Sequence, residues 1–108
     1  MINTVQFSEI HSKGCNDIEV IERILHGVVE TASSILRQRK LKTTEISIRL
    51  VHAKSENRLP LEVTFSIKPT SSSVMIYTEI INRFKERYTG EEIQGFTIQF
   101  DKNILAST

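Results

Sequence analysis

Two runs of alternating apolar and polar residues constrain the fold of this chain more than any other feature. The runs are Thr44–Leu50 and Leu61–Lys68. A strict period of two places successive side chains on opposite faces of a strand. One face of each run is apolar, and its residues are Ile46, Ile48, Leu50, Leu61, Val63, Phe65 and Ile67. The other face is polar and rich in hydroxyl groups, so the sequence predicts a sheet with one buried and one hydrophilic face.

Apolar residues spaced by three and four predict two amphipathic helices, at residues 17–39 and 72–88. Asn16 followed by Glu19 is a capping-box pattern, which places the start of the first helix at Asn16. The serine run at residues 71–73 supplies N-cap residues for the second helix.

Short alternating segments add two more strands to the two runs. The four predicted strands are residues 4–8, 43–53, 59–68 and 92–101. Residues 11–15 are expected to form a loop, residues 55–58 a hairpin connection, and Pro69 the end of the third strand.

The resulting order is strand, helix, strand, strand, helix, strand, which predicts an α+β fold. Right-handed crossovers place both helices on the same face of one four-stranded sheet. The other face then meets water or a partner, and its predicted residues are Glu45, Ser47, Arg49, Glu62, Thr64, Ser66, Lys68, Thr97 and Gln99. We expect a single domain over residues 1–108, with tails at 1–3 and 103–108.

Composition places the chain among ordinary globular domains. It has 108 residues, of which 39% are hydrophobic and 25% are charged. There is no apolar run long enough to cross a bilayer and no secretory signal at the N-terminus. The single cysteine, Cys15, is consistent with a reducing compartment, so we expect a cytoplasmic protein without membrane contact.

Positive charge is concentrated in the middle of the sequence. Residues 37–68 carry eight basic and three acidic side chains, although the net charge of the whole chain is only +1. Such a stretch could attract polyanions, but on charge alone solvation of an ordinary protein surface is the better explanation.

No motif for catalysis, metal binding or a cofactor is evident. The histidines and Cys15 lack the spacing of metal ligands, and there is no glycine-rich phosphate loop. His26 lies four residues from both Glu22 and Glu30, which predicts a solvated ion pair. We therefore expect no catalytic residue, metal or cofactor, although an enzyme with an unrecognised site stays open.

Several short stretches together resemble a known family. They are Asn16–Glu19, Ile35–Arg37 with Lys40 and Lys42, Thr44–Leu50, Leu61–Phe65, Lys68–Thr70, Tyr77–Phe84 and Ile93–Ile98. In this order they resemble the little-finger domain of Y-family translesion DNA polymerases, in the polymerase IV/V (ImpB/MucB/SamB) branch. The resemblance covers almost the whole chain, but not the palm, fingers and thumb that carry the family's metal-binding carboxylates.

The resemblance implies a non-catalytic, sequence-independent DNA-binding module that grips the duplex backbone during lesion bypass and SOS-type DNA repair. The residues that it implies for DNA contact are Thr64, Ser66, Thr97 and Gln99 through hydroxyl or amide groups, Arg49 and Lys68 through charge on the same face, and Arg37, Arg39, Lys40 and Lys42 at a helix end. For the last four, compensation of the helix dipole is the alternative. The family's last strand usually has arginine where this chain has Gln94, and often a further basic residue near Gln99, which implies weaker phosphate contact by this strand.

The expected partners are duplex or template–primer DNA and the catalytic domains of a Y-family polymerase. Two other functions stay open from the sequence. One is a protein-interaction or homo-oligomerisation domain that uses the open sheet face. The other is a small enzyme with a ferredoxin-like fold. The sequence does not distinguish a stand-alone protein from a fragment of a polymerase.

Overall fold

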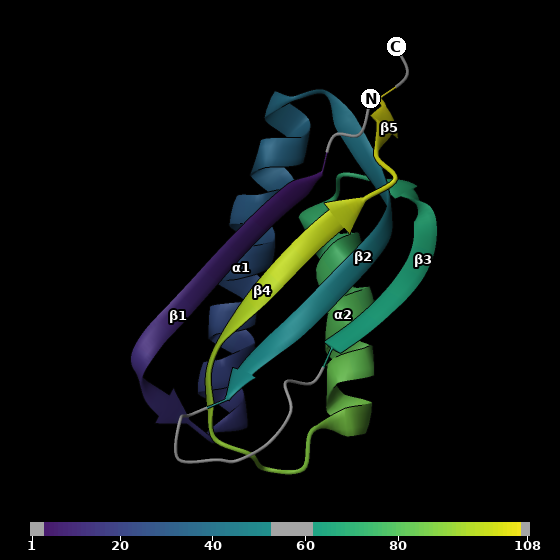
Figure 1. Cartoon of the computed structure of the whole chain (residues 1–108). Coiled ribbons are helices and arrows are strands. Elements are labelled where there is room, and N and C mark those ends of the chain that lie inside the picture. The colour runs from purple at the N-terminus through teal and green to yellow at the C-terminus, as the bar shows by residue number, and fades with distance from the viewer. Residues whose placement is uncertain (1–3, 53–61, 107–108) are drawn as a thin grey trace.

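Two helices cover one face of a mainly antiparallel sheet. The structure is a computed structural model and describes residues 4–52 and 62–106 (Figure 1). The elements in chain order are β1 (Val5–Cys15), α1 (Ile18–Gln38), β2 (Leu41–His52), β3 (Glu62–Thr70), α2 (Ser73–Arg87), β4 (Ile93–Asp101) and β5 (Ile104–Leu105). The strand order is β1-β4-β2-β3, and β5 pairs with β2. The predicted α+β fold is confirmed.

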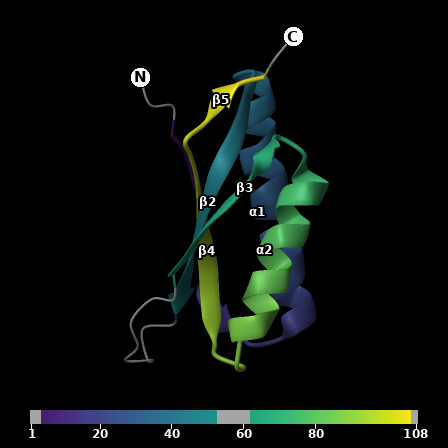
Figure 2. The ribbon, with the colours of Figure 1, turned by 90° about the vertical axis from the view of Figure 1, so that its right-hand side faces the viewer.

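The molecule has two layers, which Figure 2 shows from the side: the strands form one layer and α1 and α2 the other. The core lies between them. On β4 the side chains of Phe96, Ile98 and Phe100 are fully buried, as the alternating pattern predicts. Leu25 of α1 and Ile80 of α2 are also fully buried, so each helix buries an apolar stripe on the sheet.

The helix starts follow ordinary capping chemistry. Asp17, rather than the expected Asn16, is the N-cap of α1, and its carboxylate accepts a hydrogen bond of 3.0 Å from the amide of Glu19. At α2 the Ser72 hydroxyl accepts from the amide of Met75 at 3.3 Å. The serine run therefore caps α2 as predicted, whereas the cap of α1 lies one residue later.

The first strand is longer than expected. Residues 11–15 were expected to be a loop, but β1 continues to Cys15 and pairs with Ile93 beyond an irregularity in the register. Gly95 allows the close approach of the two strands, because a Cβ there would overlap the carbonyl oxygen of Glu9. β1 thus lies against β4 so closely that only glycine fits at residue 95.

The C-terminal segment is also ordered beyond the expected limit. Within the expected tail 103–108, Ile104 and Leu105 form β5 and pair with Lys42 and Leu41. The chain reaches this position through Lys102, which has a φ of +49°. The amide of Ala106 then donates a hydrogen bond of 2.9 Å to the carbonyl oxygen of Lys40.

Strand ends differ slightly from the prediction. β2 begins at Leu41 rather than residue 43, and β3 continues through Pro69 to Thr70. As an edge strand, β3 tolerates proline because its outer edge needs no amide donor. The expected connection at 55–58 and the inward position of Leu61 lie outside the described residues.

Candidate nucleic-acid interface

The sheet face opposite the helices is polar along all four long strands. We call it the open face, and its residues are Gln6, Ser8, Glu45, Ser47, Arg49, Glu62, Thr64, Ser66, Lys68, Thr97, Gln99 and Asp101. The register arranges them in rows across the sheet, since Thr97 lies opposite both Ser8 and Arg49. Gln99 similarly lies opposite Gln6 and Ser47. The structure thus brings together polar residues from both ends of the sequence.

Hydroxyl groups pair across neighbouring strands in the centre of the open face. The hydroxyl oxygens of Ser8 and Thr97 are 2.9 Å apart, and those of Ser47 and Thr64 are 3.0 Å apart. Each pair uses one hydrogen and leaves a second hydroxyl hydrogen and several lone pairs for another partner. Thr64 and Ser66 are exposed, and Thr97 and Gln99 are half-buried.

Several charges on this face are compensated within the protein. Arg49 Nε lies 3.1 Å from Glu62 Oε2, and Lys102 Nζ lies 3.3 Å from Glu45 Oε2. Asp101 accepts a hydrogen bond of 2.8 Å from the side-chain amide of Gln99. Arg49 is therefore engaged by a carboxylate, so a phosphate has to compete with Glu62 for it.

Six basic residues gather at one end of the sheet, where Lys102 is paired with Glu45. β2 begins where β3 and β4 end, so residues far apart in sequence meet at the upper end of Figure 1. We call this region the basic end, and its residues are Arg37, Arg39, Lys40, Lys42, Lys68 and Lys102. The structure therefore joins Lys68 and Lys102 to the cluster that the sequence shows at residues 37–42.

Most cations of the basic end are available to a ligand. Arg37 Nη1 donates a hydrogen bond of 2.9 Å to the carbonyl oxygen of Ser71, which ties α1 to the segment before α2. Among the described residues, Arg39, Lys40, Lys42 and Lys68 have no ion-pair partner. No carboxylate within residues 4–52 and 62–106 therefore neutralises their charges.

An interruption of the alternation in β2 explains the position of Lys42. Thr44 and Glu45 are both half-buried, and the register against β3 shifts between Thr43 and Glu45. Thr43 is fully buried, and its hydroxyl donates to the carbonyl oxygen of Glu45 at 3.0 Å. An unbroken period of two would place Lys42 on the face of Ile46, toward the helices. The irregularity instead places Thr43 in the interior and leaves Lys42 half-buried beside it.

Sequence reasoning missed three members of the interface. Gln6 and Ser8 belong to the open face, and the alternation of residues 4–8 was a signal that could have identified them. Lys102 belongs to the basic end. No local pattern indicates it, because its position depends on which strands pair.

Other titratable groups do not form a second site. His26 does not make the predicted ion pair, since its ring packs edge-on against Tyr77 with centroids 5.2 Å apart. Glu22 Oε2 instead lies 3.5 Å from Lys85 Nζ, and Glu30 Oε1 accepts a hydrogen bond of 3.1 Å from the Ser73 hydroxyl.

Tyr77, whose ring contacts His26, has a shifted pKa, and the described residues contain no metal site. Burial, and secondarily the charge of Glu22, raises the pKa of the Tyr77 hydroxyl. Across residues 4–52 and 62–106, no histidine, cysteine and carboxylate cluster suited to a metal is present, and no helix is long and apolar enough to cross a membrane.

Comparison with known sequences identifies one family. Residues 7–106 match the profile of the impB/mucB/samB family C-terminal domain. No curated protein matches the sequence.

Solved structures give an independent comparison of the fold. The little finger domain of PolIV, in its complex with the beta-clamp processivity factor, aligns with a TM-score of 0.71 at 10% identity, over 91% of this chain and 86% of that one. Dbh DNA polymerase, in an insertion ternary complex, aligns with a TM-score of 0.72 at 14% identity. That alignment covers 97% of this chain but 29% of the polymerase. At these identities the likeness shows a shared fold.

Proposed function

Because the chain belongs to the impB/mucB/samB C-terminal domain family, the little fingers of Y-family DNA polymerases, we propose that it is a sequence-independent DNA-binding module. In this role it grips the backbone of duplex or template–primer DNA during translesion synthesis. The observation that carries the proposal is the helix-free, hydroxyl-lined open face, which runs directly into the basic end.

The chemistry of the open face suits backbone contact rather than base reading. Hydroxyl and amide groups bond phosphate oxygens and fix the position of a domain on the duplex without carrying sequence information. Thr64 and Ser66 offer such groups on β3, and Thr97 and Gln99 offer them on β4, on the other side of β2. The compensated charges nearby keep this part of the face close to neutral, so it contributes position more than attraction.

The basic end supplies the attraction. Lys or Arg side chains that neutralise phosphates release counterions, which makes binding favourable and dependent on salt. Arg39, Lys40, Lys42 and Lys68 are the cations available for this, whereas Arg37 and Arg49 already have partners. We infer that the basic end contacts a flanking phosphate run while the open face rests on the duplex.

Catalysis is assigned to other domains. The matched domain by itself carries no catalytic site. We therefore propose that the chain works with the palm, fingers and thumb of a Y-family polymerase, in the cytoplasm, during repair of SOS type. The partnership brings the weakly binding module to DNA that the catalytic domains also hold.

Fluorescence anisotropy with a labelled primed duplex tests the proposal. If the four available cations each neutralise one phosphate, the logarithm of the binding constant falls against the logarithm of salt with a slope of about −3 to −4. Duplexes of unrelated sequence should bind within about threefold of one another, because phosphate contacts carry no sequence information. Absence of binding at low salt, or strong preference for one sequence, would contradict the proposal.

A further inference from the structure

Strand β3 forms an edge of the sheet, next to an apolar groove. It pairs with β2 on one side and, among the described residues, with no strand on the other. A groove of about 440 Å³ lies between β3 and α2 and is lined by Ser66, Ile67, Lys68, Val74, Met75, Thr78 and Glu79. Val74 is 72% and Met75 52% exposed. An edge strand with free amides and carbonyls beside apolar surface is a template for the addition of another strand.

The sequence of β3 is complementary to itself when reversed. We propose that β3 pairs antiparallel with β3 of a second copy of this chain, about a twofold axis through Phe65. In that register Glu62 lies opposite Lys68, Val63 opposite Ile67, and Thr64 opposite Ser66 of the other copy. Each acidic residue therefore lies opposite a basic one, each apolar residue opposite an apolar one, and each hydroxyl opposite a hydroxyl. Such cross-strand pairs stabilise antiparallel strands.

Neighbouring registers lack this match. A twofold axis normal to the sheet places the open faces of both copies on the same side. Open-face residues must therefore lie opposite open-face residues, which limits the registers that are possible. An axis through Thr64 places Glu62 opposite Ser66, and an axis through Ser66 places Lys68 opposite Thr64. Only the axis through Phe65 sets both charged residues against each other. Lys68 has no ion-pair partner among the described residues of its own chain.

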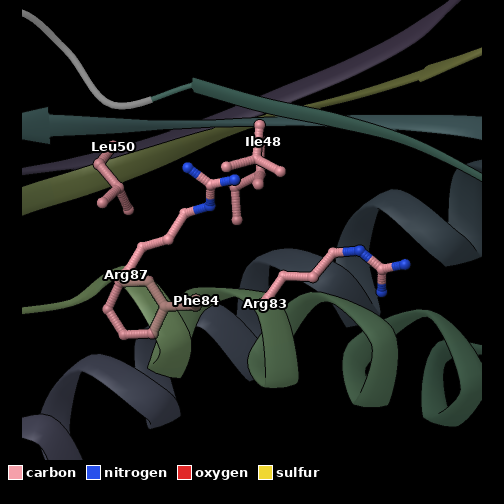
Figure 3. Close-up of a pocket in the computed structure, with 6 residues that line it drawn as sticks. Ile48, Leu50, Arg83, Phe84 and Arg87 are labelled. Atoms are coloured by element: carbon pink, nitrogen blue, oxygen red, sulfur yellow. The ribbon is translucent and has the colours of Figure 1, made fainter.

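The helix side of β3 is prepared for such an interface. Val63, Phe65 and Ile67 are only half-buried by α2. The guanidinium of Arg83 lies 3.9 Å from the centroid of the Phe65 ring and is held there by Glu79, 2.6 Å from Arg83 Nη1. Figure 3 shows the Arg83 side chain in the space between α2 and the strands. The guanidinium therefore packs over the ring of Phe65.

The opposite edge of the sheet is not self-complementary. β1 carries Glu9, which lies opposite Phe7 if two β1 strands pair about Ser8, and opposite itself if they pair about Glu9. The register of β1 also breaks after Ile10. The inference therefore applies to β3 alone.

Pairing through β3 would produce one continuous sheet. Because the axis is normal to the sheet, both open faces lie on the same side and all four helices on the other. Eight strands have seven spacings of about 4.8 Å and span about 34 Å, close to one turn of B-form DNA. This last consequence rests on the proposed function, whereas the dimer does not.

Sedimentation equilibrium without DNA, from about 1 µM to about 1 mM protein, tests the dimer. Glu62→Lys and Lys68→Glu each place like charges opposite each other twice, so each should weaken dimerisation about tenfold. An equimolar mixture of the two variants restores opposite charges at every pair across the interface. It should therefore dimerise as tightly as the unmodified protein.

The mixture is the decisive measurement, because Glu62→Lys also removes the ion pair with Arg49. Lys85→Glu on α2 is the matched charge change away from the edge and should leave dimerisation unchanged. Circular dichroism checks that every variant is folded. The proposal is overturned if the protein is monomeric at the highest concentration, if Lys68→Glu has no effect, or if the mixture stays monomeric.

Discussion

The two faces of β4 differ in polarity and burial, although the residues that form them alternate along one strand. Phe96, Ile98 and Phe100 point at the helices and are fully buried. Thr97 and Gln99, between them, lie on the open face and keep contact with solvent. If the proposed function is right, one face determines stability and the other recognition, and substitutions one residue apart should change one property without the other.

The largest expected effect is on the buried face. Phe100→Ala removes a fully buried ring and leaves a cavity, which should lower the free energy of unfolding by about 3–5 kcal/mol. Urea denaturation followed by circular dichroism measures it. A loss below about 1 kcal/mol would mean that this ring is not part of a close-packed core.

The close approach of β1 to β4 gives the next effect. In Gly95→Ala the new Cβ would meet the backbone of Glu9 and Ile10, so we expect a loss of about 2 kcal/mol in the free energy of unfolding. Gly27→Ala is the matched control, because no atom lies within 4 Å of a Cβ there. In a helix interior that change should stabilise by about 1 kcal/mol. Equal effects of both substitutions would argue against the crossing at Gly95.

The basic end should affect binding without affecting stability. Arg39→Gln combined with Lys42→Gln should weaken duplex binding about tenfold at low salt and reduce the magnitude of the salt slope by about two. Stability should change by less than about 0.5 kcal/mol. Fluorescence anisotropy over a salt series measures both the binding constant and its salt slope.

A matched pair on the helix side separates local contact from net charge. Arg23→Gln combined with Lys85→Gln removes the same charge from α1 and α2. If this pair weakens binding as much as the pair at the basic end, net charge rather than the basic end attracts DNA.

The smallest expected effect lies on the open face of β4. Thr97→Val keeps the shape of the side chain but removes the hydroxyl that pairs with Ser8 at 2.9 Å. The loss of one hydrogen bond should weaken duplex binding about threefold, with little change in stability because the site is half-exposed. Fluorescence anisotropy measures the change in duplex binding, and urea denaturation of the same variant measures the change in stability. A large loss of stability with unchanged binding would contradict the assignment of this face to DNA contact.

Sequence alone predicted the faces of β2, β3 and β4 because a strand's period of two is a local property. Thr64, Ser66, Thr97 and Gln99 accordingly lie on the open face as expected. The second half of β1, the whole of β5 and the place of Lys102 depend instead on which strands pair, and pairing is a long-range property.

Local irregularities set a second limit on what the sequence could predict. The position of Lys42, which is half-buried, depends on the break in the alternation between Thr43 and Glu45. The engagement of Arg49 by Glu62 likewise requires the register of the β2–β3 pair. The candidate site was therefore predictable in its hydroxyls and less so in its charges.

Threonine methyl groups provide the most direct test of the open face as the DNA-contacting surface. Thr64 and Thr97 lie on the open face, whereas Thr31 is exposed on α1. In a titration of methyl-labelled protein with duplex DNA, followed by NMR, the methyl signals of Thr64 and Thr97 should shift while that of Thr31 stays in place. Shifts at Thr31 with unchanged signals from Thr64 and Thr97 would contradict the account.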